Sequence, residues 1–379
     1  MKLERRLEQP WWLSIAVPVG SLVVAFAVMA VVLAITGHDP VDTYRKILDA
    51  GLTGNGAFSA TLTSATPILF TGLAAAAAFR MQLFNIGAEG QLYLGAVGAS
   101  WVALQLGDRG VGSTPVYVIG MCIGAGVLGA AWALIPGVLR AFARTNEIIT
   151  SLMLNYVAGL LLTYLIFDSS SYWRDTSSLQ ARSFPQGKPM PIESDWSTFG
   201  THVIVPLGFL VGILTAFVLW LLYSRMRFGF EVGVIADSPR AARYAGMRTR
   251  RKILAVMAVS GAIAGLGGAS QIGDFTHTLD GSPTGLQAAA FGYTGIVVAA
   301  LARYNPFAVC LVAVLIGGLQ NAGFTLQGVD FPSGLVGVMQ GIILFCALGG
   351  ELLLRYRLRL RRGSRARASA GPPAAEPAP

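Results

Sequence analysis

The sequence predicts an all-α polytopic membrane protein with about ten transmembrane helices and both termini in the cytoplasm. Its 379 residues are 54% hydrophobic and only 12% charged, whereas soluble domains carry about 25% charged residues. The apolar residues are gathered in runs long enough to cross a bilayer. The basic residues are concentrated in alternate connections between these runs. These three observations exclude a soluble domain and predict a chain whose bulk lies in the membrane.

A membrane-spanning helix needs about 20 apolar residues, and this length sets the expected spans. The first run, residues 11–35, follows the basic start MKLERR and is too long for the core of a signal peptide, which has about 7–15 residues. It is therefore expected to be an uncleaved transmembrane helix. In chain order the expected spans are residues 11–35, 60–79, 86–106, 115–139, 147–167, 203–223, 253–272, 286–302, 306–326 and 333–353.

The distribution of Lys and Arg orients these spans, because basic residues favour cytoplasmic loops. With a cytoplasmic N-terminus, most of the 28 Lys and Arg residues fall on the inner side. The exceptions, in outer loops, are Arg45, Lys46, Arg109, Arg174, Arg182 and Lys188. Nine or eleven spans would break this pattern. We therefore expect a transmembrane domain at 11–353 between cytoplasmic ends at 1–10 and 354–379.

The formal charge of +9 is thus an orientation signal, and no nucleic-acid partner is expected. The arginine-rich segment RYRLRLRR near the C-terminus is also suited to contact anionic membrane lipid. The whole basic tail, 354–379, ends in a segment rich in Pro, Ala and Ser that is expected to be disordered.

Glycine is abundant in the expected spans, with 46 glycines in the chain. Several are spaced four residues apart, which lets helix backbones approach one another closely in a membrane. The pairs are Gly120/Gly124, Gly261/Gly265 and Gly337/Gly341. They predict tightly packed helices rather than a ligand site.

The longest outer loop, residues 168–202, is polar and carries Trp173 and Trp196 before a proline-rich run. Loops of this length are usually functional or disordered. Docking of an extracytoplasmic partner is one interpretation, and the sequence leaves it open.

The inner loop, residues 224–252, contains the signals of a short helix outside the membrane. Ser238 can cap it, Pro239 suits its first position and Gly246 can end it, so the expected helix is Pro239 to Ala245. Its alanines form a small face beside Arg240 and Arg243. It can enter a groove of a partner or serve as an ordinary solvated connection, and the residues alone do not decide between these.

Recognisable catalytic chemistry is missing from the sequence. There is no G-x-x-x-x-G-K-[ST] loop to hold a nucleotide phosphate. The histidines His38, His202 and His277 form no metal-binding spacing. An enzyme is therefore not expected, and no cofactor is expected on this chain.

Polar groups at membrane depth are the features that carry function. They are costly there and usually face a pathway or a partner. Asn146 and Glu147 stand at a helix start, where a carboxylate is ordinary, so Glu147 is expected to be structural. The pathway candidates are Asn85, Glu89, Gln91, Asn155 and Asn321.

Glu89 allows two interpretations. If residues 85–96 are helical, Asn85 and Glu89 share one face opposite a glycine-rich face, and the carboxylate can contact substrate. Alternatively, Glu89 is a buried hydrogen-bond anchor that stabilises a helix break near residues 85–87. Both remain open at this point.

At these residues the sequence resembles the membrane permease subunits of ATP-binding-cassette importers, in the branch with ribose, branched-chain amino acid and nucleoside permeases. The resemblance lies in TPILFTGLAAAAAFR (66–80), LFNIGAEGQLYLGA (83–96), TNEIITSLMLNYVA (145–158) and ADSPRAARYAGM (236–247). These segments follow the family's order along most of the chain. The resemblance implies the permease fold of type II importers.

The fourth of these segments resembles the coupling helix by which such permeases rest in a groove of the ATPase. The family favours asparagine where this chain has Ser238, and both residues cap helices. The residues that the resemblance implies for coupling are Asp237, Ser238, Pro239, Arg240, Ala241, Ala242, Arg243, Tyr244, Ala245 and Gly246.

The resemblance also implies an assembly in a bacterial plasma membrane. It contains a second permease chain, in the nucleoside branch commonly a shorter relative. It also contains an ATPase, often with two fused nucleotide-binding domains that hold ATP and magnesium, and an extracytoplasmic binding lipoprotein. This chain would form half of the pathway.

The nucleoside branch is the best match, because FNIGAEGQ favours it over the sugar permeases. The same kind of importer carrying a simple sugar such as ribose is the first alternative. An ion-coupled secondary transporter is a second alternative, which would need no ATPase. Against it stands the scarcity of ionisable residues well inside a span other than Glu89.

Overall fold

The computed structural model describes residues 2–5, 12–168, 170–281, 285–326 and 334–359. Each of the apolar runs expected to span the membrane contains a helix. Their bounds are α1 Leu13–Ile35, α3 Ala57–Phe79, α4 Ala88–Asp108, α5 Thr114–Val138, α6 Glu147–Phe167, α8 Leu207–Ser224, α11 Thr249–Gln271, α12 Phe291–Leu301, α13 Pro306–Thr325 and α14 Leu335–Arg355.

Among the described residues, six helices are long and apolar enough to cross a membrane: α3, α5, α6, α8, α11 and α13. Shorter apolar helices cover residues 19–35, 291–301 and 337–346. The chain is therefore a helical, polytopic membrane protein.

Smaller elements connect these helices. Single π-helical turns follow α2, α5 and α11: they are η1 Asp49–Thr53, η2 Leu139–Ala143 and η4 Ile272–Thr276. The other short elements are α2 Pro40–Leu48, α7 Leu179–Ser183, η3 Ile192–Ser194, α9 Arg227–Asp237 and α10 Pro239–Tyr244. Two short antiparallel ladders pair β1 (Lys2–Arg5) with β4 (Tyr356–Arg359), and β2 (Thr198–Phe199) with β3 (Val205–Pro206).

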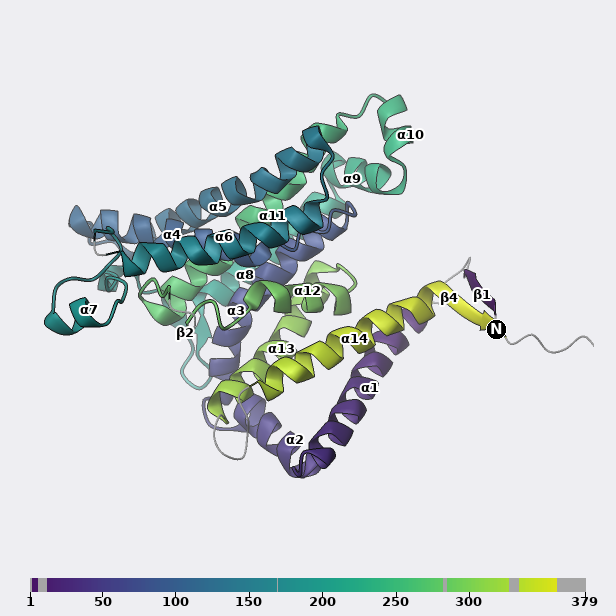
Figure 1. The fold of residues 1–379 in the computed structure, drawn as a ribbon, viewed down its shortest axis with the longest axis horizontal. Coiled ribbons are helices and arrows are strands. Elements are labelled where there is room, and N and C mark those ends of the chain that lie inside the picture. Colours follow the sequence, from purple (N-terminus) through teal and green to yellow (C-terminus); the bar gives the residue numbers. More distant parts are fainter. Residues whose placement is uncertain (1, 6–11, 169, 282–284, 327–333, 360–379) are drawn as a thin grey trace, which may run out of the picture.

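The centre of the bundle is formed by α3 and α11, which pack against each other. Helix α3 also packs against α12 and α13, while α11 also packs against α4 and α5. Five successive alanines of α3, residues 74–78, are buried, and their small side chains let the neighbouring helices come close. Figure 1 shows α1 and α14 together along one edge of this body.

Two of the three glycine pairs pack as expected. A Cβ added at Gly265 would meet the backbone of Ala125, and one at Gly261 would meet the backbone of Gly129. A Cβ at Gly124 would meet the backbone of Gly98. The third pair, on α14, differs, because nothing within 4 Å faces a Cβ added at either glycine.

Two of the helix starts that differ from the sequence-based expectation, those of α4 and α12, bear on the candidate site. Helix α4 begins at Ala88, so Asn85 precedes it and the expected common helical face with Glu89 is wrong. Helix α12 begins at Phe291 rather than at residue 286, because Ala290 adopts a left-handed conformation with φ 49°. Its 11 residues rise about 16 Å, about half of a bilayer core. Both helices therefore start inside the protein body.

The basic tail is described only in part. Residues 354 and 355 belong to α14 and residues 356–359 form β4. The disorder expected for 360–379 falls outside the described residues.

Candidate functional site

The predicted pathway residues near the start of α4 belong to a buried group of hydrogen bonds, here called the inner polar network (Asn85, Glu89, Gln91, Asn155, Ser260 and Tyr293). The side-chain amides of Asn85 and Gln91 are paired through two hydrogen bonds of 3.0 Å. Asn85 also accepts from the backbone N–H of Gly87 and donates to Ser260 on α11. Since Ser260 donates to the carbonyl of Ala74 on α3, this pair fixes the start of α4 to both central helices.

Asn155 fixes the same segment to α6. Its Oδ1 accepts from the backbone N–H of Gly90, and its Nδ2 donates to the carbonyl of Ile86, both at 2.9 Å. The same Nδ2 lies 3.3 Å from the hydroxyl of Tyr293 on α12. Asn155 thus satisfies backbone groups that the break before α4 leaves unpaired.

Glu89 connects α4 to α12. Its Oε1 accepts from the hydroxyl of Tyr93 at 2.6 Å, and its Oε2 accepts from the backbone N–H of Gly292 in the first turn of α12. The carboxylate is only 2% exposed. A negative group is favourable at a helix N-terminus. A Cβ at position 292 would meet the backbone of Glu89, so only glycine fits there.

Asn321 lies in a separate place on α13. Its Nδ2 donates to the carbonyls of Ala50 and Ala57 and lies 3.4 Å from the hydroxyl of Thr61. It therefore joins α13 to η1 and α3. The structure brings four of the five pathway candidates into the inner polar network and leaves Asn321 outside it.

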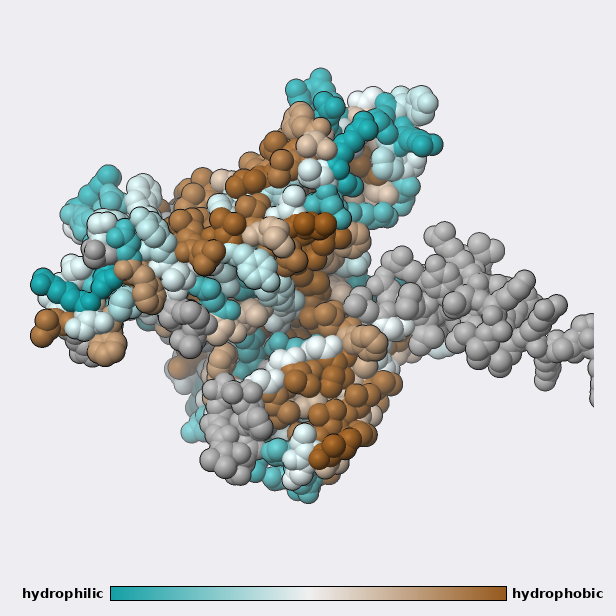
Figure 2. Space-filling view, viewed as in Figure 1, coloured by the Kyte–Doolittle hydropathy of each residue, from teal (hydrophilic) through white to brown (hydrophobic). Residues whose placement is uncertain are grey.

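Tyr293 of this network is partly exposed, two further exposed tyrosines lie on α6, and none of the three was predicted from the sequence. Tyr293 is 37% exposed, and Tyr156 and Tyr164 on α6 are 64% and 60% exposed. Figure 2 shows pale and teal patches among the brown surface where α6 and α12 lie in Figure 1. An aromatic ring in an apolar run has no periodic signal of its own, so only the fold shows which tyrosines are exposed.

Asp274 is a second carboxylate that the sequence analysis overlooked. It lies in η4, just beyond the expected end of its span, and accepts from the backbone N–H of Gly208 at the start of α8. Like Glu89, it therefore caps the start of a neighbouring helix. The segment GDF, which follows an apolar run, was the signal available in the sequence.

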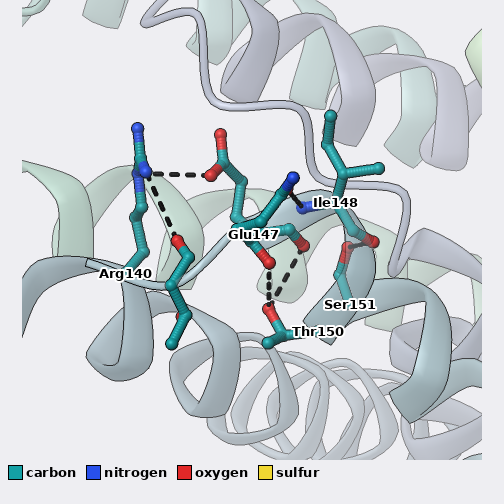
Figure 3. Close-up of polar contacts among 7 residues, drawn as sticks. Arg140, Glu147, Ile148, Thr150 and Ser151 are labelled. Carbon is teal, nitrogen blue, oxygen red and sulfur yellow. Dashed lines mark hydrogen bonds and ion pairs between the residues drawn. The ribbon is translucent and has the colours of Figure 1, made fainter. Parts of the chain in front are cut away.

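Glu147, at the start of α6, has the structural role expected for it (Figure 3). Its Oε2 pairs with Arg140 on η2 at 3.2 Å, and its side chain is 7% exposed. Asn146 caps the helix by accepting from the backbone N–H of Ile148. Thr150 donates back to the carbonyls of Asn146 and Glu147. The connection between α5 and α6 is thus fixed by local polar contacts.

A helical hairpin, α9 and α10, projects from one end of the bundle (Figure 1). The expected short helix is confirmed. Ser238 accepts from the backbone N–H of Ala241 at 3.3 Å, Pro239 opens the helix and Gly246 follows it with φ 76°. Ala242 is fully buried, whereas Tyr244 is 94% exposed.

Helix α9 was not predicted, although its apolar residues are spaced like one face of a helix. Val232 and Ile235 are its buried residues. Glu231 pairs with Lys252 at the start of α11 at 2.7 Å. The hydroxyl of Tyr223 donates to the carbonyl of Ala77 on α3. The projecting hairpin is therefore joined to α11, while Tyr223 joins the preceding helix, α8, to α3.

Comparison with known proteins gives consistent results. The sequence profile of the family described as "Branched-chain amino acid transport system / permease component" matches residues 57–348. The chain is 33% identical to the glucose ABC transporter permease protein TsgB13 of Haloferax volcanii, over 98% of this chain and 97% of that protein. It is 31% identical to the guanosine ABC transporter permease protein NupP of Bacillus subtilis, over 86% of this chain and 91% of that protein. It is 28% identical to the nucleoside ABC transporter permease protein NupB of Lactococcus lactis, over 87% of this chain and 90% of that protein.

Proposed function

Because the chain belongs to this family of transport-system permease components and is the permease of an ATP-binding-cassette importer, we propose that it carries nucleosides across the membrane. The observation that carries the proposal is the similarity to two permeases named for guanosine and for nucleosides, over more than four fifths of this chain. A simple sugar is the second candidate, because the relative named for glucose is 33% identical over nearly the whole chain. Family membership removes the ion-coupled alternative, because permeases of this kind are driven by ATP hydrolysis on a separate chain.

An importer of this kind works with an ATPase and a substrate-binding protein. We further propose that the complete assembly has a second, different permease chain, an ATPase with two fused nucleotide-binding domains, and a binding lipoprotein outside the membrane. ATP and magnesium are bound by the ATPase in this proposal, and this chain needs no cofactor.

The proposed topology has ten spans, with residues 1–10 and 354–379 in the cytoplasm of a bacterial cell. The Lys and Arg distribution supports it. The hairpin of α9 and α10 and the loop that contains α7 also lie at opposite ends of the bundle in Figure 1. The loop at 168–202 is thereby extracytoplasmic, where the binding protein approaches.

The proposed pathway runs along the exposed face of α6 and α12. Tyr156 and Tyr293 offer aromatic rings and hydroxyl groups there, which suit a nucleoside that stacks and forms hydrogen bonds. Four of the five pathway candidates, all but Asn321, act behind this face in the proposal. They hold the helix starts that border the pathway.

In the proposed coupling mechanism, α10 enters a groove of the ATPase. The segment from Asp237 to Gly246 contributes the exposed Tyr244 and a basic rim of Arg240 and Arg243. Movement of the ATPase then reaches the central helices through α9, because α9 is joined to α11 by the ion pair of Glu231 with Lys252.

The test is uptake of radiolabelled uridine and adenosine by cells that contain or lack this chain. Excess unlabelled ribose serves as competitor, and an inactive ATPase partner serves as control. Uptake that requires both proteins and ignores ribose supports the nucleoside importer. Uptake that ribose or glucose suppresses favours the sugar alternative. Uptake that survives the inactive ATPase overturns the proposal.

A further inference from the structure

A second exposed surface, here called the η2 surface (Phe142, Arg144 and Arg250), lies at the same end of the bundle as the hairpin of α9 and α10 (Figure 1). The guanidinium of Arg250, in the first turn of α11, lies 5.3 Å from the centre of the Phe142 ring on η2. Phe142 is nevertheless 58% exposed. Because α11 contacts both α10 and η2, the η2 surface continues the surface of the hairpin.

The η2 surface lies outside the hydrocarbon part of a bilayer. The apolar run Thr114–Ala143, which joins α5 to η2, has 30 residues and is about 45 Å long. A hydrocarbon core is only ~30 Å thick, so at least one end of this run reaches beyond it. Arg140 and Arg144 flank Phe142 and identify η2 as such an end, because charged residues are costly at membrane depth. Contact with lipid chains therefore does not explain the exposed ring of Phe142.

The charge of this end fits an acidic partner. Within residues 139–147 and 225–252, Glu147 and Glu231 are held in ion pairs, and the remaining acidic residue is Asp237. Several exposed arginines there have no side-chain partner within the described part of the chain: Arg144, Arg240, Arg248 and Arg251. Arginine and aromatic residues are also the types enriched at protein interfaces. The η2 surface is therefore suited to an acidic face of another protein.

Two polar contacts connect η2 to α6. Arg140 pairs with Glu147, the first residue of α6, and donates to the carbonyl of Thr145 at 3.3 Å (Figure 3). Two turns further along α6, Asn155 holds the break before α4 through two backbone groups. A displacement of η2 is therefore passed through α6 to the start of α4.

The hairpin reaches the same break through α11. Glu231 of α9 pairs with Lys252 of α11, and Ser260 of α11 accepts a hydrogen bond from Asn85, which precedes α4. The start of α4 is thus held by α11 and by α6. A partner that contacts both α10 and η2 moves these two helices together, whereas a partner that contacts α10 alone moves α11 against α6.

We propose that the ATPase contacts the η2 surface as well as α10, and that the ion pair of Arg140 with Glu147 passes its movement to α6. This inference rests on the coupling proposed above and extends it to a second segment of the chain. The ATPase is the partner because it acts at the end of the bundle that carries the hairpin. Phe142 and Arg144 make the contact, and Arg140 is a positioning residue.

The experiment uses the complete importer, purified through a tag on this chain and reconstituted in proteoliposomes with its binding protein. Co-purified ATPase, ATP hydrolysis and nucleoside uptake are measured for each variant. Phe142→Ala and Arg144→Glu change the contact. Phe345→Ala, an exposed phenylalanine on α14, and Arg45→Glu, an exposed arginine on α2, are the matched controls.

Arg144→Glu should lower the amount of co-purified ATPase by about tenfold, because like charges then face each other at the interface. Phe142→Ala should lower it by about fivefold, the effect of removing one aromatic anchor. Both controls should retain the ATPase as the wild type does.

Arg140→Gln tests the connection to α6 separately. The ATPase should stay bound, while the amount of nucleoside transported per ATP hydrolysed falls by about fivefold. Arg140→Lys keeps the charge and should retain most of the transport. If Arg140→Gln does not fold because Glu147 is left unpaired, Arg140→Gln combined with Glu147→Gln removes both charges. An unchanged ratio of transport to hydrolysis in these variants would overturn the role of the ion pair.

Normal co-purification of the ATPase with both Phe142→Ala and Arg144→Glu would overturn the second contact. If phosphatidylglycerol then raises the unfolding temperature of the wild type but not of Arg144→Glu, the η2 surface binds anionic lipid instead. The double variant Arg240→Glu and Arg243→Glu separates the two proposals. Loss of the ATPase in that variant alone would support the coupling role of α10 and overturn the contact at η2. Co-purification does not depend on which substrate is transported, so failure of the proposed substrate is also distinguishable.

Discussion

The carboxylate of Glu89 on α4 accepts a hydrogen bond from the backbone N–H of Gly292, 203 positions later in the chain. The contact joins two helices that both begin inside the protein body. The other carboxylate oxygen accepts from the hydroxyl of Tyr93. One side chain therefore satisfies two buried donors, and its replacement leaves both without a partner.

Glu89→Ala is predicted to lower the free energy of unfolding by about 2–3 kcal/mol, because buried donors without partners are costly. Glu89→Gln keeps one carbonyl oxygen, so it should lose less. Thermal unfolding in detergent and the amount of folded protein in membranes measure both changes. Glu193→Ala, in η3, is the control. If Glu89→Gln reduces uptake severalfold with normal stability, the carboxylate contacts substrate and the anchoring role is insufficient.

Glycine spacing alone does not decide whether a helix face is packed, and two matched variants test this. Gly265→Val should destabilise the protein by about 1–3 kcal/mol, because the added side chain has no space against α5. Gly337→Val occupies the same spacing in the sequence, but nothing within 4 Å faces it. It should change the unfolding temperature little. Equal losses in the two variants would contradict the described packing.

Reversing the charge of the projecting hairpin should uncouple transport from ATP hydrolysis. The double variant Arg240→Glu and Arg243→Glu is predicted to reduce uptake by about tenfold or more, because like charges at an interface cost several kcal/mol. Both side chains are exposed, so the amount of folded permease should stay normal. Co-purification of the ATPase is the second measurement. Arg109→Glu, at the end of α4, is the control. Wild-type uptake by the double variant would refute the coupling role.

The loop that contains Asp175 and α7 should become less stable in acid. Asp175 accepts from the backbone N–H of Ser177, which holds the pKa of its carboxyl below the ordinary value of 3.8. Its contribution to stability is therefore present above that value and is lost as the pH falls through the lower folded pKa. Cleavage by pepsin near the exposed Phe184 should accelerate as the pH falls below about 4.

Asp175→Asn removes the titrating group at this position. The variant should be cleaved faster than the wild type at the upper end of the range in which pepsin is active. Its cleavage should also change less with pH. An identical pH profile in wild type and variant would assign the acid sensitivity to another group.

The sequence predicted the positions of the long helices well, because an apolar run of about 20 residues leaves few alternatives. It also predicted α10, since the cap at Ser238 and the glycine at 246 act locally. Local sequence signals were less reliable at helix ends whose positions are set by tertiary contacts. The start of α12 depends on Ala290 and on Glu89, which lies far away in the sequence.

The inner polar network shows the same limit. The residue types of Asn85 and Asn155 marked them as unusual at membrane depth, but their partners include backbone groups that every residue carries. No sequence pattern shows which backbone carbonyl groups lack a hydrogen-bond donor from within their own helix. The exposed Tyr156 was missed for the converse reason, since only the fold shows which side of α6 is uncovered.

The antiparallel ladder of β1 with β4 restricts how many times the chain can cross a membrane. Lys2 pairs with Arg359, so the path of the chain returns to the side from which it started. A chain that returns to the side of a membrane from which it started has crossed that membrane an even number of times. Two fluorescent labels, one at position 2 and one at position 359, would therefore report a short distance. Removing a single crossing would force the ladder apart.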